Sequence, residues 1–293
     1  MPVPKSRANP WLFAVMIDGH ANARPPAGLK KASVVYEALA EGGIPRFMAI
    51  FSSRDVGLIG PVRSARPYFV RWAAEYRAAF AHAGGSPDGL RLLNSLRMPN
   101  VEGIKGKTAK YFFRYGGNGV HNLFTNSPLL TQALRQARYD RYKPTYRPWK
   151  FSLDLPLAER RKGLHGAEVD LAAGRTYDVR YEYDRQRNIY RRFTGGRPHL
   201  DRPSGKQLYA KNVVLLLVPK ERVLDRQGRL ELKILGRGKA ILLKDGRSVT
   251  VNWRKPTTYG RTIFTDSRGK EISFNRGPIW ITAVSRGHRY TLF

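Results

Sequence analysis

The sequence predicts an α+β protein with two domains, and three observations support this. In residues 1–145, short apolar segments alternate with segments whose apolar residues recur at helical spacing, which is typical of a layered α/β domain. In residues 146–293, apolar and polar residues alternate with a period of two between turn sequences, so this domain is expected to be mainly β. Between them, YDRYKPTYRPWK (139–150) has two prolines and no periodicity, and we interpret it as an interdomain linker.

The first domain begins with the apolar run WLFAVMID, which ends at Asp18. A polar residue at the carboxyl end of a buried strand is a common position for ligand contacts in α/β folds. Ser86 is the expected N-cap of one helix, and Asn126 or Ser127 of another. The expected elements are strands at 11–18, 33–40, 47–51 and 80–83, and helices at 66–79, 87–96 and 128–137.

The second domain is predicted to consist of strands. Asp245-Gly246 lies between KAILLK and RSVTVNW, which is a strong signal for a two-residue hairpin turn. The other expected strands lie at 177–183, 189–193, 207–219 and 280–284. The polar candidates of this domain are Tyr190, Arg192, His199 and Asp201, for which a purely structural role is the simplest interpretation.

The net charge is high. Lys and Arg number 53 against 22 Asp and Glu, which gives +31, divided almost evenly between the two halves. Such a field attracts polyanions such as nucleic acid, anionic lipid or a phosphate-bearing polymer. The alternative is a solvated surface adapted to a habitat, for example that of a thermophile. The linker also interleaves aromatic and basic residues, which permits stacking on bases, although interdomain packing is the simpler interpretation.

Several functions are excluded or unsupported. The chain has no Cys, so disulfides and thiolate chemistry are excluded. No apolar run approaches about 20 residues, so no transmembrane segment is expected. Nucleotide-binding loops, the serine-hydrolase elbow, the HExxH zinc motif and nucleic-acid-reading motifs are also missing. Residues 1–10 have no apolar signal core, so the protein is either cytoplasmic or begins after a removed signal or lipid anchor.

Polar residues gather at turns of the first domain. Arginine forks bind phosphate or carboxylate groups, and the Gly-rich starts of predicted helices, GPVRSAR (60–66) and HAGGSP (82–87), offer backbone N–H groups. The candidate ligand-binding residues are Asp18, Arg24, Glu37, Glu41, Arg46, Arg63, Ser64, Arg66, Arg114 and Asn122, and the candidates for proton transfer are His82 and His121. The alternatives are that the arginines form structural salt bridges and that His82 is a hydrogen-bonded core histidine.

No metal site is predicted. Asp18, Glu37 and Glu41 are a weak signal for a divalent cation, because carboxylates at this spacing are common without a metal. Any other cofactor is unknown from the sequence.

These same segments resemble the YerB-like putative lipoprotein family, a bacterial family of unknown function with N- and C-terminal domains. The matching text includes AVMIDGHANARPPAGLKKASVVYEALAEGGIPRFMAIF, IGPVRSARPYF, AHAGGSP and HNLFT, and then YEYDRQRNIYRRF, KNVVLLLV, GKAILLKDGRSVTVNW and GPIWITAV. The match spans about residues 12–285, with Gly19 and Ser33 where Asn and Asp are expected. The resemblance implies an exported, membrane-anchored envelope protein whose N-terminal signal or lipid segment is missing.

Three hypotheses follow. The first is an extracytoplasmic protein that binds an anionic ligand or polymer through the arginines of the first domain. The second is a non-catalytic adaptor that binds nucleic acid or protein. The third is a phosphotransferase. The order of AVMID, Arg24 and PVRSAR along the chain resembles the order of the corresponding parts in the LytR-CpsA-Psr phosphotransferases, although no motif aligns. Those enzymes hold a lipid pyrophosphate with arginines.

Overall fold

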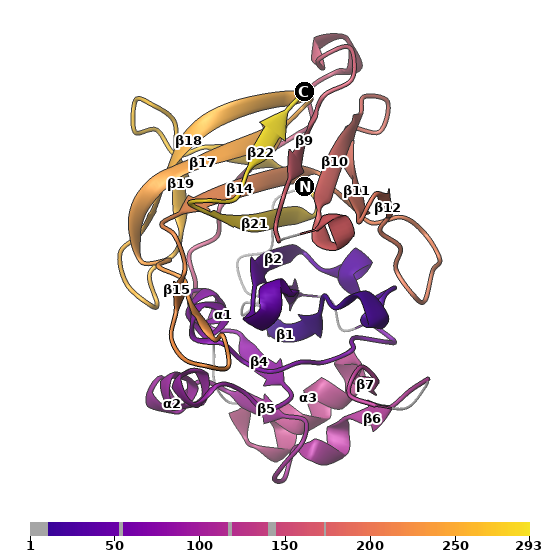
Figure 1. Ribbon diagram of the computed structural model, residues 1–293, viewed down its shortest axis with the longest axis vertical. Helices are drawn as coiled ribbons and strands as arrows, with labels where there is room; N and C mark the ends of the chain where they lie inside the picture. The colour runs from indigo at the N-terminus through magenta and orange to yellow at the C-terminus, as the bar shows by residue number, and fades with distance from the viewer. Residues whose placement is uncertain (1–10, 53–54, 117–118, 140–144, 173) are drawn as a thin grey trace, which may run out of the picture.

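The computed structural model describes residues 11–52, 55–116, 119–139, 145–172 and 174–293. Within these ranges, all three α-helices belong to the N-terminal half, as Figure 1 shows. They are α1 (Pro67–Ala74), α2 (Pro87–Ser95) and α3 (Ser127–Gln136). The strands of this half are β1 (Phe13–Asp18), β2 (Val34–Leu39), β3 (Pro45–Phe51), β4 (Ala79–His82), β5 (Asn100–Glu102), β6 (Phe113–Arg114) and β7 (Leu123–Phe124).

The C-terminal half consists of strands and short 3-10 turns. The strands are β8 (Lys150–Ser152), β9 (Gly166–Val169), β10 (Val179–Asp184), β11 (Ile189–Thr194), β12 (Arg197–Pro198), β13 (Tyr209–Ala210), β14 (Asn212–Val218), β15 (Arg222–Val223), β16 (Leu230–Glu231), β17 (Gly236–Lys244), β18 (Arg247–Lys255), β19 (Ile263–Thr265), β20 (Ser273–Asn275), β21 (Ile279–Ser285) and β22 (Tyr290–Leu292). The predicted fold class, an α/β layered domain followed by a mainly β domain, is confirmed.

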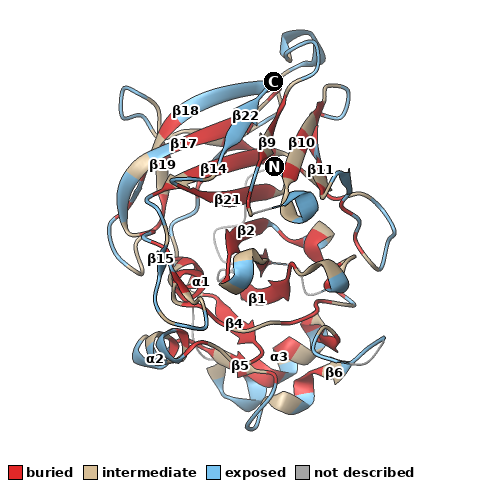
Figure 2. Ribbon diagram, in the orientation of Figure 1, coloured by how far each residue is buried: buried red, intermediate tan, exposed pale blue. Residues whose placement is uncertain are grey.

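One ten-stranded sheet runs through both halves in the order β19-β18-β17-β14-β21-β2-β3-β1-β4-β5. The halves meet where β2 pairs in parallel with β21, from Val34 opposite Ile279 to Glu37 opposite Thr282. Every residue of β1, β2 and β3 is buried, and Figure 2 shows these strands in the centre of the molecule. A smaller sheet, β12-β11-β10-β9-β22 with β13 beside β11, belongs to the C-terminal half.

Most local predictions in the N-terminal half are confirmed. The Ser86 Oγ accepts a hydrogen bond from the Gly89 N–H, and Asn126, not Ser127, caps α3. The helix expected over 66–79 is shorter, because it ends at Ala74 and Ala79 already pairs with β1. Helical periodicity did not reveal this end, because the buried Tyr76 continues the apolar spacing of the helix beyond Ala74.

In the C-terminal half, the Asp245-Gly246 hairpin is confirmed, with positive φ at both residues, as a tight turn of this kind requires. The expectation of a single strand over 207–219 is wrong. The chain breaks at Lys211, since β13 pairs with β11 in the smaller sheet while β14 lies between β17 and β21 in the large sheet. The break is required because β13 and β14 pair with strands of two different sheets.

The linker predicted over 139–150 includes residues 140–144, which lie outside the described residues, and the domain boundary at 145/146 stays a prediction. Trp149, at the end of this segment, is buried against Phe264 and Phe274, with ring centroids 5.9 and 4.9 Å away. Its ring also lies edge-on to Tyr76 of the N-terminal half, with centroids 6.3 Å apart, so this part of the linker packs between the halves. Among the described residues, no helix is long and apolar enough to cross a membrane.

A buried carboxylate, Glu75 of the N-terminal half, is held mainly by the C-terminal half. It accepts hydrogen bonds from the Lys255 Nζ at 3.0 Å and the Arg261 Nη1 at 2.8 Å. The backbone N–H and the hydroxyl of Thr262 also donate to it, at 2.8 and 2.7 Å, and so does the Tyr36 hydroxyl at 2.5 Å. The two halves are therefore joined by a fully hydrogen-bonded buried charge.

A second buried carboxylate, Glu37 on β2, has the same kind of partners. Its Oε1 accepts from the Arg192 Nη2 at 2.6 Å. Its Oε2 accepts from the Trp280 indole N–H at 3.2 Å and the Thr282 hydroxyl at 3.0 Å. Both Glu37 and Arg192 are almost fully buried, so each depends on the other for charge neutralisation.

We predict that Glu75→Gln destabilises the protein by about 3–5 kcal/mol, because two buried cations lose their counter-charge. Urea unfolding followed by circular dichroism measures the change. Asp88→Asn is the control, since the Asp88–Arg91 pair is exposed and is expected to contribute less than about 1 kcal/mol. Equal effects of the two substitutions would contradict a central role for the interface.

We also predict that stability falls in acid because of Glu75. Burial alone would raise the pKa of this carboxyl, but the charges of Lys255 and Arg261 outweigh it and hold the pKa below the ordinary value of 4.5. A group with a lowered pKa in the folded state stabilises the protein above its unfolded pKa and loses this effect as the pH falls. Unfolding measured from pH 7 to 3 should therefore lose more stability below about 4.5 in wild type than in Glu75→Gln.

Candidate functional site

Predicted site residues from three parts of the chain meet where β1 ends and β3 begins. Asp18 ends β1, and its antiparallel partner on β3 is Arg46. The segment that follows Gly60 crosses the same end of the sheet, because the Asp18 N–H donates to the Pro61 carbonyl and the Arg63 N–H donates to the Met16 carbonyl. Asp18 lies at this position because the buried apolar run of β1 ends at this ionisable residue.

Asp18 is a buried carboxylate with a histidine and an arginine as partners. It is only 2% exposed. Its Oδ2 lies 2.7 Å from the His121 Nδ1 and 3.1 Å from the Arg63 Nε. Its Oδ1 accepts from the His20 N–H at 2.9 Å. Asp18 thereby fixes the orientation of the His121 ring.

The two histidines of this site are stacked. The rings of His20 and His121 lie 4.6 Å apart with an interplanar angle of 19°. The His20 Nδ1 accepts a hydrogen bond from the Asn22 N–H, whereas the Nε2 of His121 has no hydrogen-bond partner in the described part of the chain. His121 is therefore held at one nitrogen and available at the other, the arrangement that acid–base histidines require.

Glu41 binds two more of the predicted arginines. The Arg66 Nε and Nη2 donate to its two carboxylate oxygens at 2.6 Å, and the Arg46 Nη2 lies 3.2 Å from it. Burial alone would raise the pKa of Glu41, but the hydrogen bonds from Arg66 and the charge of Arg46 hold it below its ordinary value. Arg66 also donates to the Ala65 carbonyl at 2.6 Å.

Arg46 is a buried cation whose hydrogen bonding is incomplete. It is 8% exposed, and burial, with the charge of Arg66 next in size, lowers its pKa to about 10. Its Nη1 is buried without a hydrogen-bond partner among the described residues. We call Arg46, Arg63 and Arg66, with Asp18 and Glu41, the arginine cluster. Three guanidinium groups against two carboxylates leave donors that fit a compact anion.

The other predicted residues lie around this cluster or away from it. The Arg114 Nη1 donates to the Asn122 Oδ1 at 2.5 Å and to the Gly119 carbonyl at 3.0 Å, so this pair braces the segment that carries His121. Ser64 is half-buried and makes no side-chain hydrogen bond within the described ranges. Glu37 and Arg24 instead belong to the boundary between the halves, since Arg24 donates to the Thr176 carbonyl at 2.9 Å.

The Gly-rich turn at 82–87 does not join the cluster. The carboxylate of Glu102, which the sequence analysis did not single out, already accepts from the Gly84 and Ile104 N–H groups, at 3.0 and 2.8 Å. His82 is fully buried, and its two nitrogens contact the Gly84 carbonyl and the Asn100 amide oxygen at 2.7 and 2.8 Å. The geometry of His82 is that of a hydrogen-bonded core histidine.

The described residues contain no group of three or more His, Asp or Glu arranged to hold a metal ion. Asp18, Glu37 and Glu41 are instead each paired with arginine.

His20 is a residue of the site that the sequence did not single out. Its position two residues after Asp18 is a signal that could have found it.

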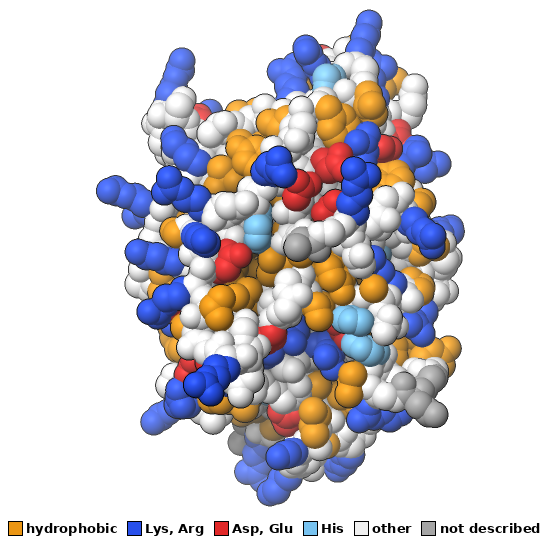
Figure 3. All heavy atoms as spheres, viewed as in Figure 1, with side chains coloured by type: hydrophobic (Ala, Val, Ile, Leu, Met, Phe, Trp, Pro, Cys, Tyr) orange, Lys and Arg blue, Asp and Glu red, His pale blue; other side chains and the backbone are white. Residues whose placement is uncertain are grey.

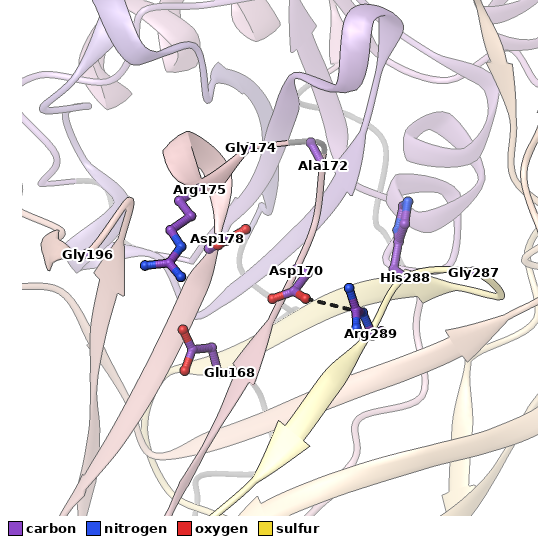
Figure 4. Close-up of a pocket in the computed structure, with 10 residues that line it drawn as sticks. All are labelled: Glu168, Asp170, Ala172, Gly174, Arg175, Asp178, Gly196, Gly287, His288 and Arg289. Atoms are coloured by element: carbon purple, nitrogen blue, oxygen red, sulfur yellow. Dashed lines mark ion pairs between the residues drawn. The ribbon is translucent and has the colours of Figure 1, made fainter.

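A different hollow, of about 710 Å³, lies beside β9 and the C-terminal segment. In Figure 4, the carboxylates of Glu168, Asp170 and Asp178 surround it, and Arg289 pairs with Asp170 at 3.9 Å. Burial, and then the charges of Asp170 and Glu168, raise the pKa of Asp178. Figure 3 shows acidic side chains gathered in one area of this face, with Lys and Arg spread over the remainder. This hollow therefore carries a local group of acidic side chains on a face where Lys and Arg are widespread.

The comparisons with known proteins identify the family. The N-terminal domain model of a protein family of unknown function, DUF3048, matches residues 1–140, and its C-terminal domain model matches residues 167–281. The chain belongs to this two-domain family of unknown function. The resemblance to YerB-like proteins is thereby confirmed.

A relative from Bacillus subtilis is similar over most of the chain, both in its sequence and in its crystal structure. The Bacillus subtilis (strain 168) protein named "Putative lipoprotein YerB" is 30% identical over 272 residues, which are 92% of this chain and 80% of that protein. The crystal structure of the YerB protein from Bacillus subtilis matches with a TM-score of 0.85 and 28% identity, covering 99% of this chain and 97% of that one.

Proposed function

We propose that this protein lies outside the cytoplasm, anchored to the membrane or secreted, and binds an anionic ligand at the arginine cluster. The name of the Bacillus subtilis relative, a putative lipoprotein, supports the location, which implies a signal or lipid segment at the N-terminus. The ligand carries phosphate or carboxylate groups, because guanidinium forks match both in geometry and charge.

One observation carries the proposal. The Arg46 Nη1 is buried beside Arg66 and has no hydrogen-bond partner in the described ranges. A buried donor without an acceptor costs about 1–3 kcal/mol, so such a group is expected to have a ligand or an ordered water as its partner. Arg63, whose side chain is 24% exposed, supplies a second cation that solvent can reach.

The net charge of +31 supports the same proposal by raising the local concentration of polyanions. It also supports nonspecific binding of nucleic acid, which would depend on the whole surface and not on the cluster. A divalent cation bound to the phosphate groups of the ligand is compatible both with binding at the arginine cluster and with nonspecific binding of nucleic acid.

We predict that Arg63→Ala weakens binding of pyrophosphate about tenfold or more, because one charge-assisted contact is lost. Isothermal titration calorimetry at low salt measures the affinity. Arg91→Ala is the matched control, since Arg91 lies on the exposed face of α2 and pairs only with Asp88 within the described chain.

Equal affinity in wild type and Arg63→Ala would remove the assignment of the cluster. Binding to duplex DNA that falls steeply with salt, and equally in both variants, would instead indicate the nucleic-acid alternative.

A second candidate function, phosphoryl transfer, is favoured by the 2.7 Å contact between Asp18 and the His121 Nδ1. A hydroxyl oxygen of an acceptor would bond to a phosphorus of a pyrophosphate donor as its proton moves to the His121 Nε2. The bond from that phosphorus to the bridging oxygen would break, and the leaving phosphate would take the proton. The arginine cluster would hold the charged oxygens, as in other phosphoryl-transfer sites.

We predict that His121→Gln lowers any transfer from a prenyl pyrophosphate donor to an alcohol by about 100-fold or more, because the proton acceptor is lost. Product formation with and without Mg²⁺ is measured by mass spectrometry, and pyrophosphate binding should be unchanged. His165→Gln, outside the site, is the control. Absence of product in wild type would exclude this candidate and leave the binding function intact.

A further inference from the structure

A cavity of about 550 Å³ lies between the two halves, apart from the arginine cluster. Arg24 and Pro25 line it from the N-terminal half. The C-terminal half contributes Thr176, Gly195, His199 and Leu200, among others. Both halves are thus needed to form it, and Arg24 was predicted to bind a ligand without any indication of this location.

The hydrogen bonds of His199 fix its tautomer. The Arg192 Nε donates to the His199 Nδ1 at 3.0 Å. Because arginine has only donors, this Nδ1 must be an acceptor, and the ring hydrogen lies on Nε2. Burial, followed by the charges of Arg192 and Arg24, holds the pKa of His199 well below its ordinary value, which agrees with a neutral ring.

The N–H at Nε2 is left without an acceptor. His199 is 3% exposed, and its Nε2 is buried with no hydrogen-bond partner in the described part of the chain. Arg192, in turn, cannot turn away, because its other nitrogens donate to Glu37 and the Tyr181 hydroxyl, each at 2.6 Å. The hydrogen bonds of Arg192 to Glu37, Tyr181 and His199 therefore hold the His199 ring in the orientation in which its Nε2 lacks a partner.

The charge of the cavity favours an anion. Arg24 is held by its bond to the Thr176 carbonyl and by the Tyr177 ring, whose centroid is 5.2 Å from the guanidinium carbon. Arg197 is a second cation of the lining, and the described lining residues include no Asp or Glu. Burial lowers the pKa of Arg24, a sign that its positive charge is poorly solvated there.

We propose that this interdomain cavity binds a carboxylate-bearing molecule, with the Arg24 guanidinium and the His199 Nε2–H as its donors. One guanidinium fork and one neutral N–H match the two oxygens of a carboxylate better than the larger charge of a phosphate. The apolar surfaces of Pro25, Pro198 and Leu200 fit a short aliphatic body beside it. The lining residues of this site do not include those of the arginine cluster, so the inference goes beyond the proposed function.

The test uses the whole protein and three probes: glutarate, the tripeptide Ala-Ala-Ala, and the same tripeptide with an amidated C-terminus. Long-range ¹H–¹⁵N spectra of the histidine rings report the His199 Nε2, and calorimetry reports affinity. We expect the amidated peptide not to bind, and glutarate or the free tripeptide to shift the His199 Nε2–H signal. Whichever of the two binds more tightly shows whether the ligand is a free acid or a peptide terminus.

Arg24→Gln should weaken this binding at least tenfold, because the positive charge and the guanidinium fork are lost, and Arg24→Lys, which keeps the charge, should weaken it less. Arg63→Ala is the matched control that should leave it unchanged, and Arg24→Gln should leave pyrophosphate binding unchanged. The two sites can therefore fail separately. If no acid shifts the His199 signal, or if Arg24→Gln binds as wild type does, an ordered water satisfies Nε2 and the proposal is wrong.

Discussion

The structure depends on two buried carboxylates whose charge is neutralised across the boundary between the halves. Glu37 on β2 relies on Arg192, and Glu75 after α1 relies on Lys255 and Arg261. An unpaired buried carboxylate is too costly to maintain, so neither half has a satisfied core surface without the other. The shared sheet, joined at β2 and β21, places these charges opposite their partners. We therefore regard the two homology domains as one folded unit.

This constraint also explains why the two candidate sites differ. In the arginine cluster, Asp18 and Glu41 are outnumbered by three arginines from the same half, so donors remain available where β1 ends and β3 begins. At the boundary, the charges of Glu37 and Arg192 balance, and what remains is a neutral N–H on His199 beside Arg24. The first arrangement suits a highly charged ligand and the second a single carboxylate. A ligand in the second site would contact both halves.

The net charge of +31 locates neither site, because it is spread over both halves. What distinguishes Arg46 is a buried guanidinium group whose hydrogen bonding is incomplete. Arg91, for example, is exposed and pairs with Asp88, whereas the buried Arg46 Nη1 has no hydrogen-bond acceptor among the described residues. The acidic hollow around Asp178 shows the converse, a local excess of negative charge that overall composition conceals.

The sequence by itself determined the fold class, most strands and helices, the Ser86 cap and the Asp245-Gly246 turn, because these depend on local periodicity and turn chemistry. It also grouped Asp18, Arg46, Arg63 and Arg66 as candidates for one site, although it wrongly added Arg24 to them. Only the tertiary structure decided that Glu37 and Arg24 belong to the boundary, that 207–219 divides between two sheets, and that Glu102 occupies the Gly84 turn. These outcomes depend on pairing between residues as many as 155 positions apart, as for Arg192 and Glu37, and such pairing leaves no local pattern in the chain.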